Sequence, residues 1–539
     1  RVLVERYLYI LENGDLDEGS EIESILAITF TKKASQEMKE RIRKNIKEKF
    51  SLDPKWRRMY RDLEKGNIST IHSFCSKILK ENPIEANIDP QFKVLEDHES
   101  DEILYEVVKE IILKGINSCE KVYELMKNFN VYNLDNPIYT MMNLYKKIRS
   151  TGMSFEKVRE ITLNNIQGVE FNEKDIFYIL DEFKYLMSKS RKNSKLYKLK
   201  EDPIWIDFSQ RDSYDESVLD VLLYLKDNIG TMSSEEDRIS TLIETIDKVL
   251  KVAEKDKIEL YETLIELLVQ IDLEFSKAKS SLGYLDYEDL QIKVLHLLDI
   301  DEVRKEYQKK YKYIMIDEFQ DTNELQRQIV YKLASENSKL DRQNLFIVGD
   351  PKQSIYAFRG ADVEVFNDVI EDIVEVSKIE AISLKDNYRS MNTVLEFVNC
   401  IFEKVMKERY EPLDAKIKSP NDVDVEILEN ENLEVPDGES TGEFNKYYES
   451  RLIAKRIKSL VDSGDYKYGD FALLFRSSTE DYIYEEALRE YGIPYYNFGG
   501  KGFFRQEEIV DLLNGIKGIS NIYDTISLVG VLRSPMFGL

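Results

Sequence analysis

A chain of 539 residues is too long for a single hydrophobic core and indicates two to four domains. Hydrophobic residues make up 42% of it, which supports a folded chain, while a net charge of −26 excludes a wholly basic, histone-like protein. The acidic balance does not exclude nucleic acid as a partner, because a binding groove needs only local Lys, Arg and aromatic side chains.

The three cysteines and three histidines are scattered along the chain. They form neither a disulfide framework nor a cluster with metal-ligand spacing. No apolar run is long enough to span a bilayer, and no secretory signal is visible. These features favour a reducing, cytoplasmic setting and a protein without a membrane partner.

The first segments of the chain alternate between helix and strand signals. The opening RVLVERYLYILENG is amphipathic and predicts a helix that stops at Gly14. The apolar run from Ile25 to Phe30 predicts a buried strand. After it, apolar residues recur every four positions from Ala34 to Phe50, which predicts a second amphipathic helix.

A long central stretch, from about Asp97 to Ser280, has few strand signals and carries apolar residues at helical spacing. We therefore predict an all-helical insertion within an α/β domain. Nearer the carboxyl end, residues 391–406 predict a helix. The string FALLFRSS, Phe471 to Ser478, predicts a strand that is followed by a helix to Tyr491.

Two short apolar runs, Ile314 to Ile316 and Leu345 to Val348, end abruptly in an acidic residue or a Gly-Asp pair. Runs this short, bounded by turn residues and separated by a helical segment, predict buried parallel strands of an α/β domain. Ligands of such sheets sit beyond the carboxyl ends of the strands. The polar residues at these ends are Asp317, Glu318, Asp350 and Gln353.

Asp317 and Glu318 form an acidic pair directly after the first of these runs. One carboxylate of such a pair can bind Mg²⁺ while its neighbour handles the water that attacks a phosphoryl group. We assign Asp317 as the residue that binds the metal and Glu318 as the residue that acts on the attacking water. The alternative is a solvated Asp-Glu loop, which the dipeptide alone does not exclude.

Longer strings around these residues carry a family resemblance. IDEFQDTNELQ, followed by VGDPKQSIYAFRGAD, resembles motifs II and III of the UvrD/Rep superfamily of DNA helicases. ITFTKKASQEM, STIHSFC and LKDNYRS resemble motifs Ia, Ib and IV, and LGYLDYEDLQ resembles the segment that leads back into the α/β domain. The closing string SNIYDTISLVGVLRSPMFGL resembles the RecB-like branch, specifically the A subunits of bacterial AddAB-type helicase–nucleases.

The resemblance implies an α/β fold of RecA-like P-loop NTPase motor domains with a large all-helical insertion. Residues 1–96 and 281–384 correspond to the first motor domain (1A), and residues 97–280 to the helical insertion (1B). Residues 385–539 correspond to the amino-terminal part of the second motor domain (2A), reaching the start of a second insertion (2B).

The resemblance also implies roles for single residues. Glu318 handles the attacking water, Gln353 senses the terminal phosphate of ATP, and Arg389 reaches the γ-phosphate from the second domain. Asp317 holds Mg²⁺ and Tyr388 stacks on adenine. The residues implied to contact DNA are Phe30, Thr31, Thr70, His72, Tyr356, Phe358 and Arg359. Without the motifs, a Phe at a strand end would be assigned to the core, and a lone His or Arg to a structural role.

The implied function is an ATP-dependent 3′–5′ translocase or helicase on single-stranded DNA that uses ATP and Mg²⁺. It would be the motor of a helicase–nuclease in double-strand break repair and recombination. Its implied partners are single-stranded and duplex DNA and a second, AddB-like subunit. Three alternatives stay open: a UvrD/Rep-type repair helicase without nuclease, a DNA-binding scaffold with an inactive motor, and an ATP-dependent motor that acts on something other than nucleic acid. A motor acting on something other than nucleic acid would have no use for the aromatic residues of these motifs.

One element of such a motor is missing from the sequence, the phosphate-binding loop G-x-x-x-x-G-K-[ST]. In the helicase family this loop directly precedes a helix like that of residues 1–14. We therefore expect the chain to be a fragment that begins just after its P-loop. A natural pseudo-ATPase is the alternative.

We predict that this chain, purified by itself, shows no DNA-stimulated ATP hydrolysis and no unwinding. Phosphoryl transfer needs a backbone cradle with its lysine, Mg²⁺ and an arginine from the opposing domain, and the sequence offers neither the cradle nor its lysine. The measurement is ATP turnover with and without single-stranded DNA. Adding a phosphate-binding loop should restore nucleotide binding, whereas DNA-stimulated turnover by the chain alone would mean that the phosphate site lies elsewhere.

Overall fold

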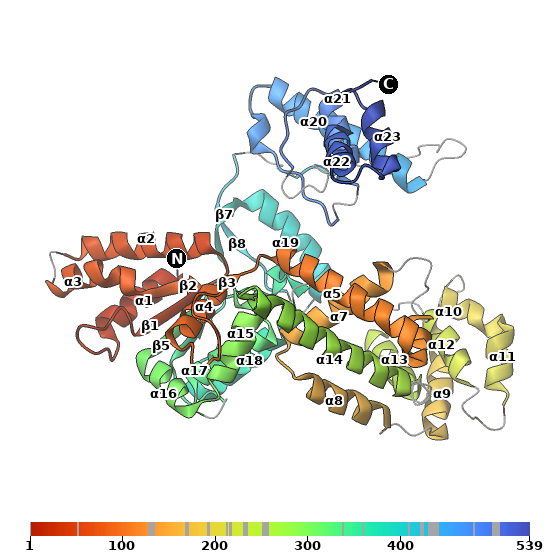
Figure 1. Ribbon diagram of the computed structural model, residues 1–539, viewed down its shortest axis with the longest axis horizontal. Coiled ribbons are helices and arrows are strands. Elements are labelled where there is room, and N and C mark those ends of the chain that lie inside the picture. The colour runs from red at the N-terminus through yellow and green to blue at the C-terminus, as the bar shows by residue number, and fades with distance from the viewer. Residues whose placement is uncertain are drawn as a thin grey trace. The chain divides into compact units, whose positions relative to one another are not determined.

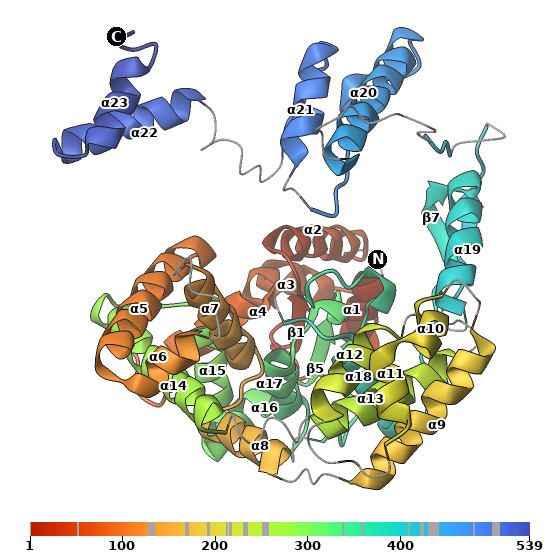
Figure 2. The same ribbon diagram turned by 90° about the vertical axis from the view of Figure 1, so that its right-hand side faces the viewer.

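The computed structural model describes residues 2–538 except 51–52, 128–134, 168–171, 191–193, 212–213, 215–217, 230–234, 251–257, 337–338, 358–359, 408–409, 421–424, 429–440, 478–479 and 498–506. The chain divides into two compact units, Arg1–Ala381 (the first unit) and Ile382–Leu539 (the second unit). Figures 1 and 2 show the elements of each. No helix in the described ranges is both long and apolar enough to cross a membrane.

The first unit is built on a four-stranded parallel sheet with the strand order β2-β1-β5-β6. Its strands are β1 (Ile25–Thr29), β2 (Asn67–Thr70), β5 (Tyr313–Ile316) and β6 (Leu345–Ile347). All five residues of β1 are buried, as expected for a strand covered on both faces. The predicted strands at residues 25–30, 314–316 and 345–348 are therefore confirmed, as is the parallel direction predicted for the last two, and the unit is of the α/β class.

Helices cover both faces of this sheet (Figure 1). Ile25 and Ala27 of β1 face a core with α1 (Val2–Asn13), α2 (Lys32–Glu48) and α3 (Lys55–Asp62). The alternate residues Leu26 and Ile28 face a second core on the other side. The helices of that second core are α4 (Ile71–Glu81), α15 (Tyr287–Leu297), α16 (Asp301–Lys310), α17 (Glu324–Ala334) and α18 (Val363–Ser377). The two amphipathic helices predicted near the amino terminus are confirmed as α1 and α2.

A helical region interrupts this α/β unit between β3 (Lys93–Val94) and β4 (Tyr284–Leu285), which pair with each other. Its helices are α5 (Asp97–Ser118), α6 (Glu120–Lys127), α7 (Asp135–Ser150), α8 (Phe155–Gln167), α9 (Glu173–Lys189), α10 (Lys195–Lys198), α11 (Pro203–Ser209), α12 (Leu219–Asp227), α13 (Glu236–Leu250) and α14 (Ile258–Ser281). They enclose two cores, one within α5, α6, α7 and α14 and the other within α9 to α13. Pairing of β3 with β4 brings the two ends of the helical region together, so it leaves and re-enters the α/β unit at one place.

The second unit contains a pair of parallel strands, β7 (Asp386–Met391) and β8 (Asp414–Ile417), beside α19 (Asn392–Met406). Its other helices are α20 (Thr441–Asp462), α21 (Asp481–Glu490), α22 (Glu507–Ser520) and α23 (Thr525–Arg533). The helices predicted at 391–406 and before Tyr491 are confirmed as α19 and α21.

The strand predicted from Phe471 to Ser478 is wrong, because residues 471–477 are described and lie outside any strand. A strand needs a hydrogen-bonded neighbour, and no described segment pairs with this one. Leu474 is 94% exposed here, so the apolar pattern that predicted the strand is not buried.

Candidate functional site

The carboxyl ends of the four parallel strands form one edge of the sheet, and the predicted site residues of the first unit gather along it. Phe30 and Thr31 follow β1, Thr70 ends β2 and precedes His72, Asp317 and Glu318 follow β5, and Gln353 and Tyr356 lie in the loop after β6. Parallel topology brings together residues that are more than 300 positions apart, at the edge where α/β sheets bind ligands.

The backbone turns sharply at the acidic pair. The Asp317 N–H still donates to the Ile28 carbonyl of β1 at 2.9 Å, which fixes Asp317 at the end of the sheet. Glu318 has a φ of 51°, in the left-handed region that a non-glycine residue seldom adopts. This turn leaves the Glu318 side chain exposed and lets Phe319 enter the core as the first residue of a 3₁₀ turn, η5 (Phe319–Asp321). Such strain is typical of functional positions.

The acidic pair fits a divalent cation. Asp317 is half-buried, and burial, followed by the charge of Glu318, raises the pKa of its carboxyl. Neither carboxylate forms an ion pair with a Lys or Arg in the described ranges. A nearby cation would offset this negative charge. Mg²⁺ commonly binds through one or two carboxylates together with substrate phosphates and water, so a three-residue metal cluster, which the described residues lack, is not required.

Gln320 connects the two loops that carry the candidate catalytic groups. Its side chain is 1% exposed. Its Nε2 donates to Glu318 Oε2 at 2.8 Å, and its Oε1 accepts from the Asp350 N–H at 2.9 Å. Ser354 Oγ donates to the backbone carbonyl of Gln320 at 3.2 Å. The carboxylate predicted to handle water is thus held by the same amide that holds the loop after β6.

Gly349 is required for this connection. A Cβ at Gly349 would lie 2.6 Å from Gln320 Oε1, so that the amide would have to move, and a tight 3.0 Å from the Phe366 ring. No pattern in the sequence indicates a role for Gln320 or for its contact with Gly349. The only signal was an amide two residues after Glu318 and a glycine directly before Asp350, and neither indicates that the two meet.

Gln353 is held at the surface by its own loop. Its Nε2 donates to Asp350 Oδ2 at 2.9 Å, and Lys352 Nζ lies 3.1 Å from Asp350 Oδ1. Burial disfavours the charged form of Asp350, but the hydrogen bonds from Gln353 and Lys352 outweigh it and hold the pKa of Asp350 below its usual range. An ionised Asp350 therefore orients an exposed Gln353 amide beside the acidic pair.

Two predicted DNA-contacting aromatic residues pack against each other. The rings of Phe30 and Tyr356 lie 4.7 Å apart between centroids at an interplanar angle of 46°. Phe30 remains 37% exposed, and Tyr356 is half-buried. An exposed aromatic pair joins the end of β1 to the loop after β6.

The two predicted threonines begin helices. Thr31 Oγ1 accepts from the Ala34 N–H at 3.0 Å and caps α2, and Thr70 Oγ1 accepts from the Ser73 N–H at 3.3 Å and caps α4. Helix amino termini attract phosphate through their free N–H groups and the helix dipole. Both threonines therefore stand where a DNA phosphate would be stabilised.

His72 contacts Tyr287, the aromatic residue of the segment leading back into the α/β unit. Their ring centroids are 4.7 Å apart, and the Gln291 amide lies 3.3 Å from His72 Nε2. The Tyr287 hydroxyl donates to Glu96 at 3.1 Å. His72 is thus part of a packed group at the junction with the helical region.

The remaining predicted residues belong to the second unit or lie outside the described residues. Tyr388 and Arg389 belong to β7 of the second unit, and both are exposed. Asn387 Oδ1 accepts from the Arg389 N–H at 2.9 Å, while the guanidinium has no ion pair with a described carboxylate. Phe358 and Arg359 lie outside the described residues.

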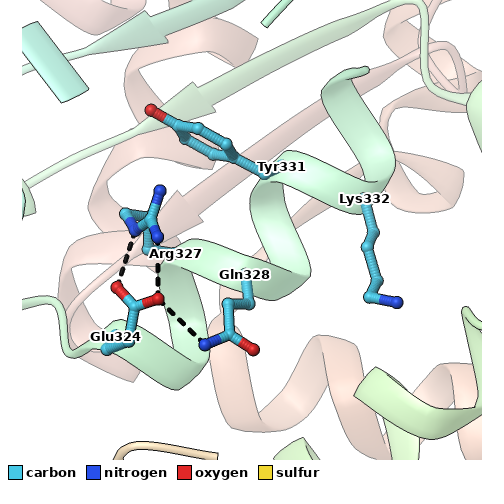
Figure 3. Close-up of a pocket in the computed structure, with 5 residues that line it drawn as sticks. All are labelled: Glu324, Arg327, Gln328, Tyr331 and Lys332. Atoms are coloured by element: carbon cyan, nitrogen blue, oxygen red, sulfur yellow. Dashed lines mark hydrogen bonds and ion pairs between the residues drawn. The ribbon is translucent and has the colours of Figure 1, made fainter. Parts of the chain in front are cut away.

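A cavity of about 250 Å³ on α17 contains none of the predicted site residues (Figure 3). It is lined by Glu324, Arg327, Gln328, Tyr331 and Lys332. Arg327 makes two 2.7 Å contacts with Glu324, and the Gln328 amide donates to the same carboxylate at 2.9 Å. These groups satisfy one another, so the cavity lacks the unpaired polar atoms expected of a ligand site.

Known proteins resemble this chain along its whole length. The family described as UvrD/REP helicase N-terminal domain matches residues 1–374, and the UvrD-like helicase C-terminal domain matches residues 382–539. Proteins named as the A subunit of an ATP-dependent helicase/nuclease, from Listeria welshimeri, Ligilactobacillus salivarius and Clostridium novyi, are 29%, 27% and 26% identical to it. The alignments cover 99–100% of this chain and 50% of each relative, so the chain spans about half the length of the curated relatives it matches. With the first family covering well over half of its residues, the chain belongs to the UvrD/Rep family of helicases.

Proposed function

We propose that this chain is the motor part of an ATP-dependent DNA helicase, in a helicase–nuclease of the type its relatives' names describe. The observation that carries the proposal is the edge of the parallel sheet. There the Asp317–Glu318 pair, the exposed Gln353 amide and the Phe30–Tyr356 pair follow neighbouring strands. One edge thus combines groups suited to phosphoryl transfer with groups suited to unstacked bases.

Each polar group has a task in ATP hydrolysis. Asp317 would hold Mg²⁺, which would supply positive charge against the phosphates of ATP. Glu318, fixed by Gln320, orients and deprotonates the attacking water. Gln353 hydrogen-bonds the terminal phosphate, and because Asp350 holds both Gln353 and the Gln320 amide, the phosphate contact is linked to Glu318.

The second unit supplies the remaining groups in this proposal. Tyr388 stacks on the adenine and Arg389 stabilises the charge on the γ-phosphate, as expected of exposed side chains with no ion pair among the described carboxylates. Both units are proposed to be RecA-like motor domains, with residues 1–96 and 281–384 as 1A, 97–280 as 1B, and 385–539 as the start of 2A.

Single-stranded DNA would cross the same edge. Phe30 and Tyr356, with Phe358 and Arg359, offer flat faces and a cation to unstacked bases, and Thr31, Thr70 and His72 lie at two helix starts that attract phosphates. The loop after β6 would then contact both DNA and ATP, which is a physical basis for coupling hydrolysis to movement.

Further parts of the proposal rest on the relatives' names and the family resemblance. They are movement in the 3′–5′ direction, a nuclease activity in the whole protein, a role in double-strand break repair and an AddB-like partner. A bacterial DNA motor would act in the cytoplasm, where its DNA and ATP are found.

Replacement of both Tyr356 and Phe358 by Ala tests the DNA part of this proposal. If both rings stack on bases, single-strand affinity should fall by up to about 1–3 kcal/mol per base. The slope of log affinity against log salt should barely change, because no phosphate contact is lost. The measurement is fluorescence anisotropy of a labelled single strand over a salt series. A changed slope with little loss of affinity at low salt would show that these rings belong to the core.

A further inference from the structure

The helix that follows Thr31 has a charge opposite to that of the chain as a whole. The chain has 102 acidic against 76 basic residues. Within α2, seven Lys and Arg stand against three Glu, and α3 adds four cations and one Asp. Both helices lie on the outer side of the same core of the first unit (Figure 1). An otherwise acidic protein thus presents a local basic surface.

Several cations of α2 recur at regular spacing along one side of the helix. Lys32, Gln36, Lys39, Arg43 and Lys47 follow one another at spacings of four, three, four and four residues, and are named here the α2 stripe. Residues at these spacings lie on one side of a helix. The stripe flanks the buried row of Met38, Ile42 and Ile46. Glu37 and Glu48 of α2 occupy other rows, while Glu40 lies beside the stripe, where the Gln36 amide donates to it at 3.5 Å.

Most of these cations are uncompensated. Arg43 pairs with Glu64, which follows α3. Lys32, Lys39 and Lys47 have no ion pair with a described carboxylate. Lys32 and Lys47 are exposed, and Lys39 is half-buried beside the core. Long side chains in such positions lay their stems on apolar surface and keep the ammonium group in water, available to an anion.

The α2 stripe begins at the candidate DNA site. Lys32 directly follows Thr31, and Phe30, whose ring packs on Tyr356, precedes it. From Lys32 to Lys47 the helix rises about 22 Å at about 1.5 Å per residue, which is the length of several backbone phosphates. Repeated cations, a helix amino terminus and an adjacent aromatic pair are together typical of a nucleic-acid surface.

We propose that the α2 stripe binds the sugar–phosphate backbone of DNA that extends beyond the Phe30–Tyr356 pair. This inference rests on the proposed function only in taking DNA as the ligand. Lys32 and Gln36 fall within the string that resembles motif Ia, and the inference extends the surface past that string to Lys39, Arg43 and Lys47. Lys32, Lys39 and Lys47 contact phosphates, and Arg43, held by Glu64, stiffens the surface.

The test is the triple variant Lys32→Gln, Lys39→Gln, Lys47→Gln of this chain, with labelled single-stranded and duplex DNA of the same length. Each lost phosphate contact lowers the slope of log affinity against log salt by about 0.7 for a single strand and about 0.9 for a duplex. The slope should therefore fall by about 2 on single-stranded DNA or by about 2.7 on duplex DNA. The form of DNA whose salt slope falls, single-stranded or duplex, is the form that the α2 stripe binds.

A matched control makes the same charge change elsewhere. Lys174, Lys184 and Lys198 are exposed on α9 and α10 and have no ion pair with a described carboxylate. Their triple Gln variant should keep the parent slope. Gln retains the helix propensity of Lys, and equal circular dichroism melting curves would show that both variants fold.

The other outcomes overturn the inference in different ways. An unchanged slope on both DNA forms, or the same change in the control, would exclude the α2 stripe as a phosphate surface. In either case DNA binding by Tyr356 and Phe358 would stand, because their variant changes affinity and not slope. No binding of either DNA form by the parent chain would overturn both this inference and the DNA part of the proposed function.

Discussion

Replacement of Glu318 by Gln is expected to leave ATP bound but to slow its hydrolysis roughly 10²–10⁴-fold, the usual contribution of a general base. Gln keeps the size of the side chain and can still meet the Gln320 amide, but it lacks the charge that takes a proton from water. The experiment uses a protein in which this chain is joined to a phosphate-binding loop and extended to the length of its relatives, half of which it matches. Nucleotide binding and DNA-stimulated turnover are measured side by side.

The control for this prediction is Glu375→Gln. Glu375 is exposed in the last turn of α18, at the opposite end of that helix from the loop after β6, and its replacement removes the same charge. Its turnover should match that of the parent protein. Near-normal hydrolysis by the Glu318→Gln variant would contradict the role given to Glu318, while loss of nucleotide binding would mean that the carboxylate serves binding and not the water.

Replacement of Arg149 by Met is expected to destabilise the first unit by about 3–5 kcal/mol, the usual cost of breaking a buried ion pair on one side. Arg149 ends α7 of the helical region and lies 2.8 Å from Asp286 and 2.6 Å from Asp289, at the start of α15. Lys279 of α14 reaches the same two carboxylates. All four side chains are 12% exposed or less, so the variant leaves two buried carboxylates with one cation.

The effect of this substitution should depend on pH. Burial opposes the ionisation of Asp286, but Arg149 and Lys279 outweigh it and hold the pKa of Asp286 below its usual range. A depressed carboxylate pKa contributes stability that is complete above the unfolded value of about 3.9 and is lost as the pH falls toward the folded value. The difference between the parent and the Arg149→Met variant should therefore shrink below about pH 4.

Denaturant unfolding followed by the fluorescence of Trp56 and Trp205, both buried in the first unit, measures this difference. Arg159→Met is the matched control. Arg159 lies 3.2 Å from Glu262 with both side chains well exposed, and such surface pairs contribute about 0–1 kcal/mol. Equal losses in the two variants, or none with Arg149→Met, would show that the buried network does not fasten the helical region to the sheet.

The strands and their polar ends could be predicted from the sequence because their signals are local. Buried parallel strands appear as short apolar runs bounded by turn residues, and β1, β5 and β6 each have that pattern. Their shared direction then places Phe30, Asp317 and the loop with Gln353 at one edge. The motifs added roles for these residues, which no local pattern supplies.

The contacts that tune the site could not be predicted in this way. The Gln320 hydrogen bond to the Asp350 N–H joins residues 30 positions apart, and the packing of His72 on Tyr287 joins residues more than 200 apart. Neither of these two contacts produces a periodic pattern in the sequence. The strand predicted at Phe471 failed for the same reason, since its pattern was local but a strand exists only with a neighbour.

The sequence by itself determined the family, the α/β class and the residue types at each strand end, because apolar periodicity and contiguous motifs are properties of neighbouring residues. Only the tertiary structure decided that Glu318 takes a left-handed backbone conformation, that Gln320 links it to the loop after β6, and that Arg149 meets Asp286 across 137 positions. Hydrogen bonds and ion pairs in a low-dielectric interior depend on distances of about 3 Å, and those distances are set when helices and strands pack, not by their order along the chain.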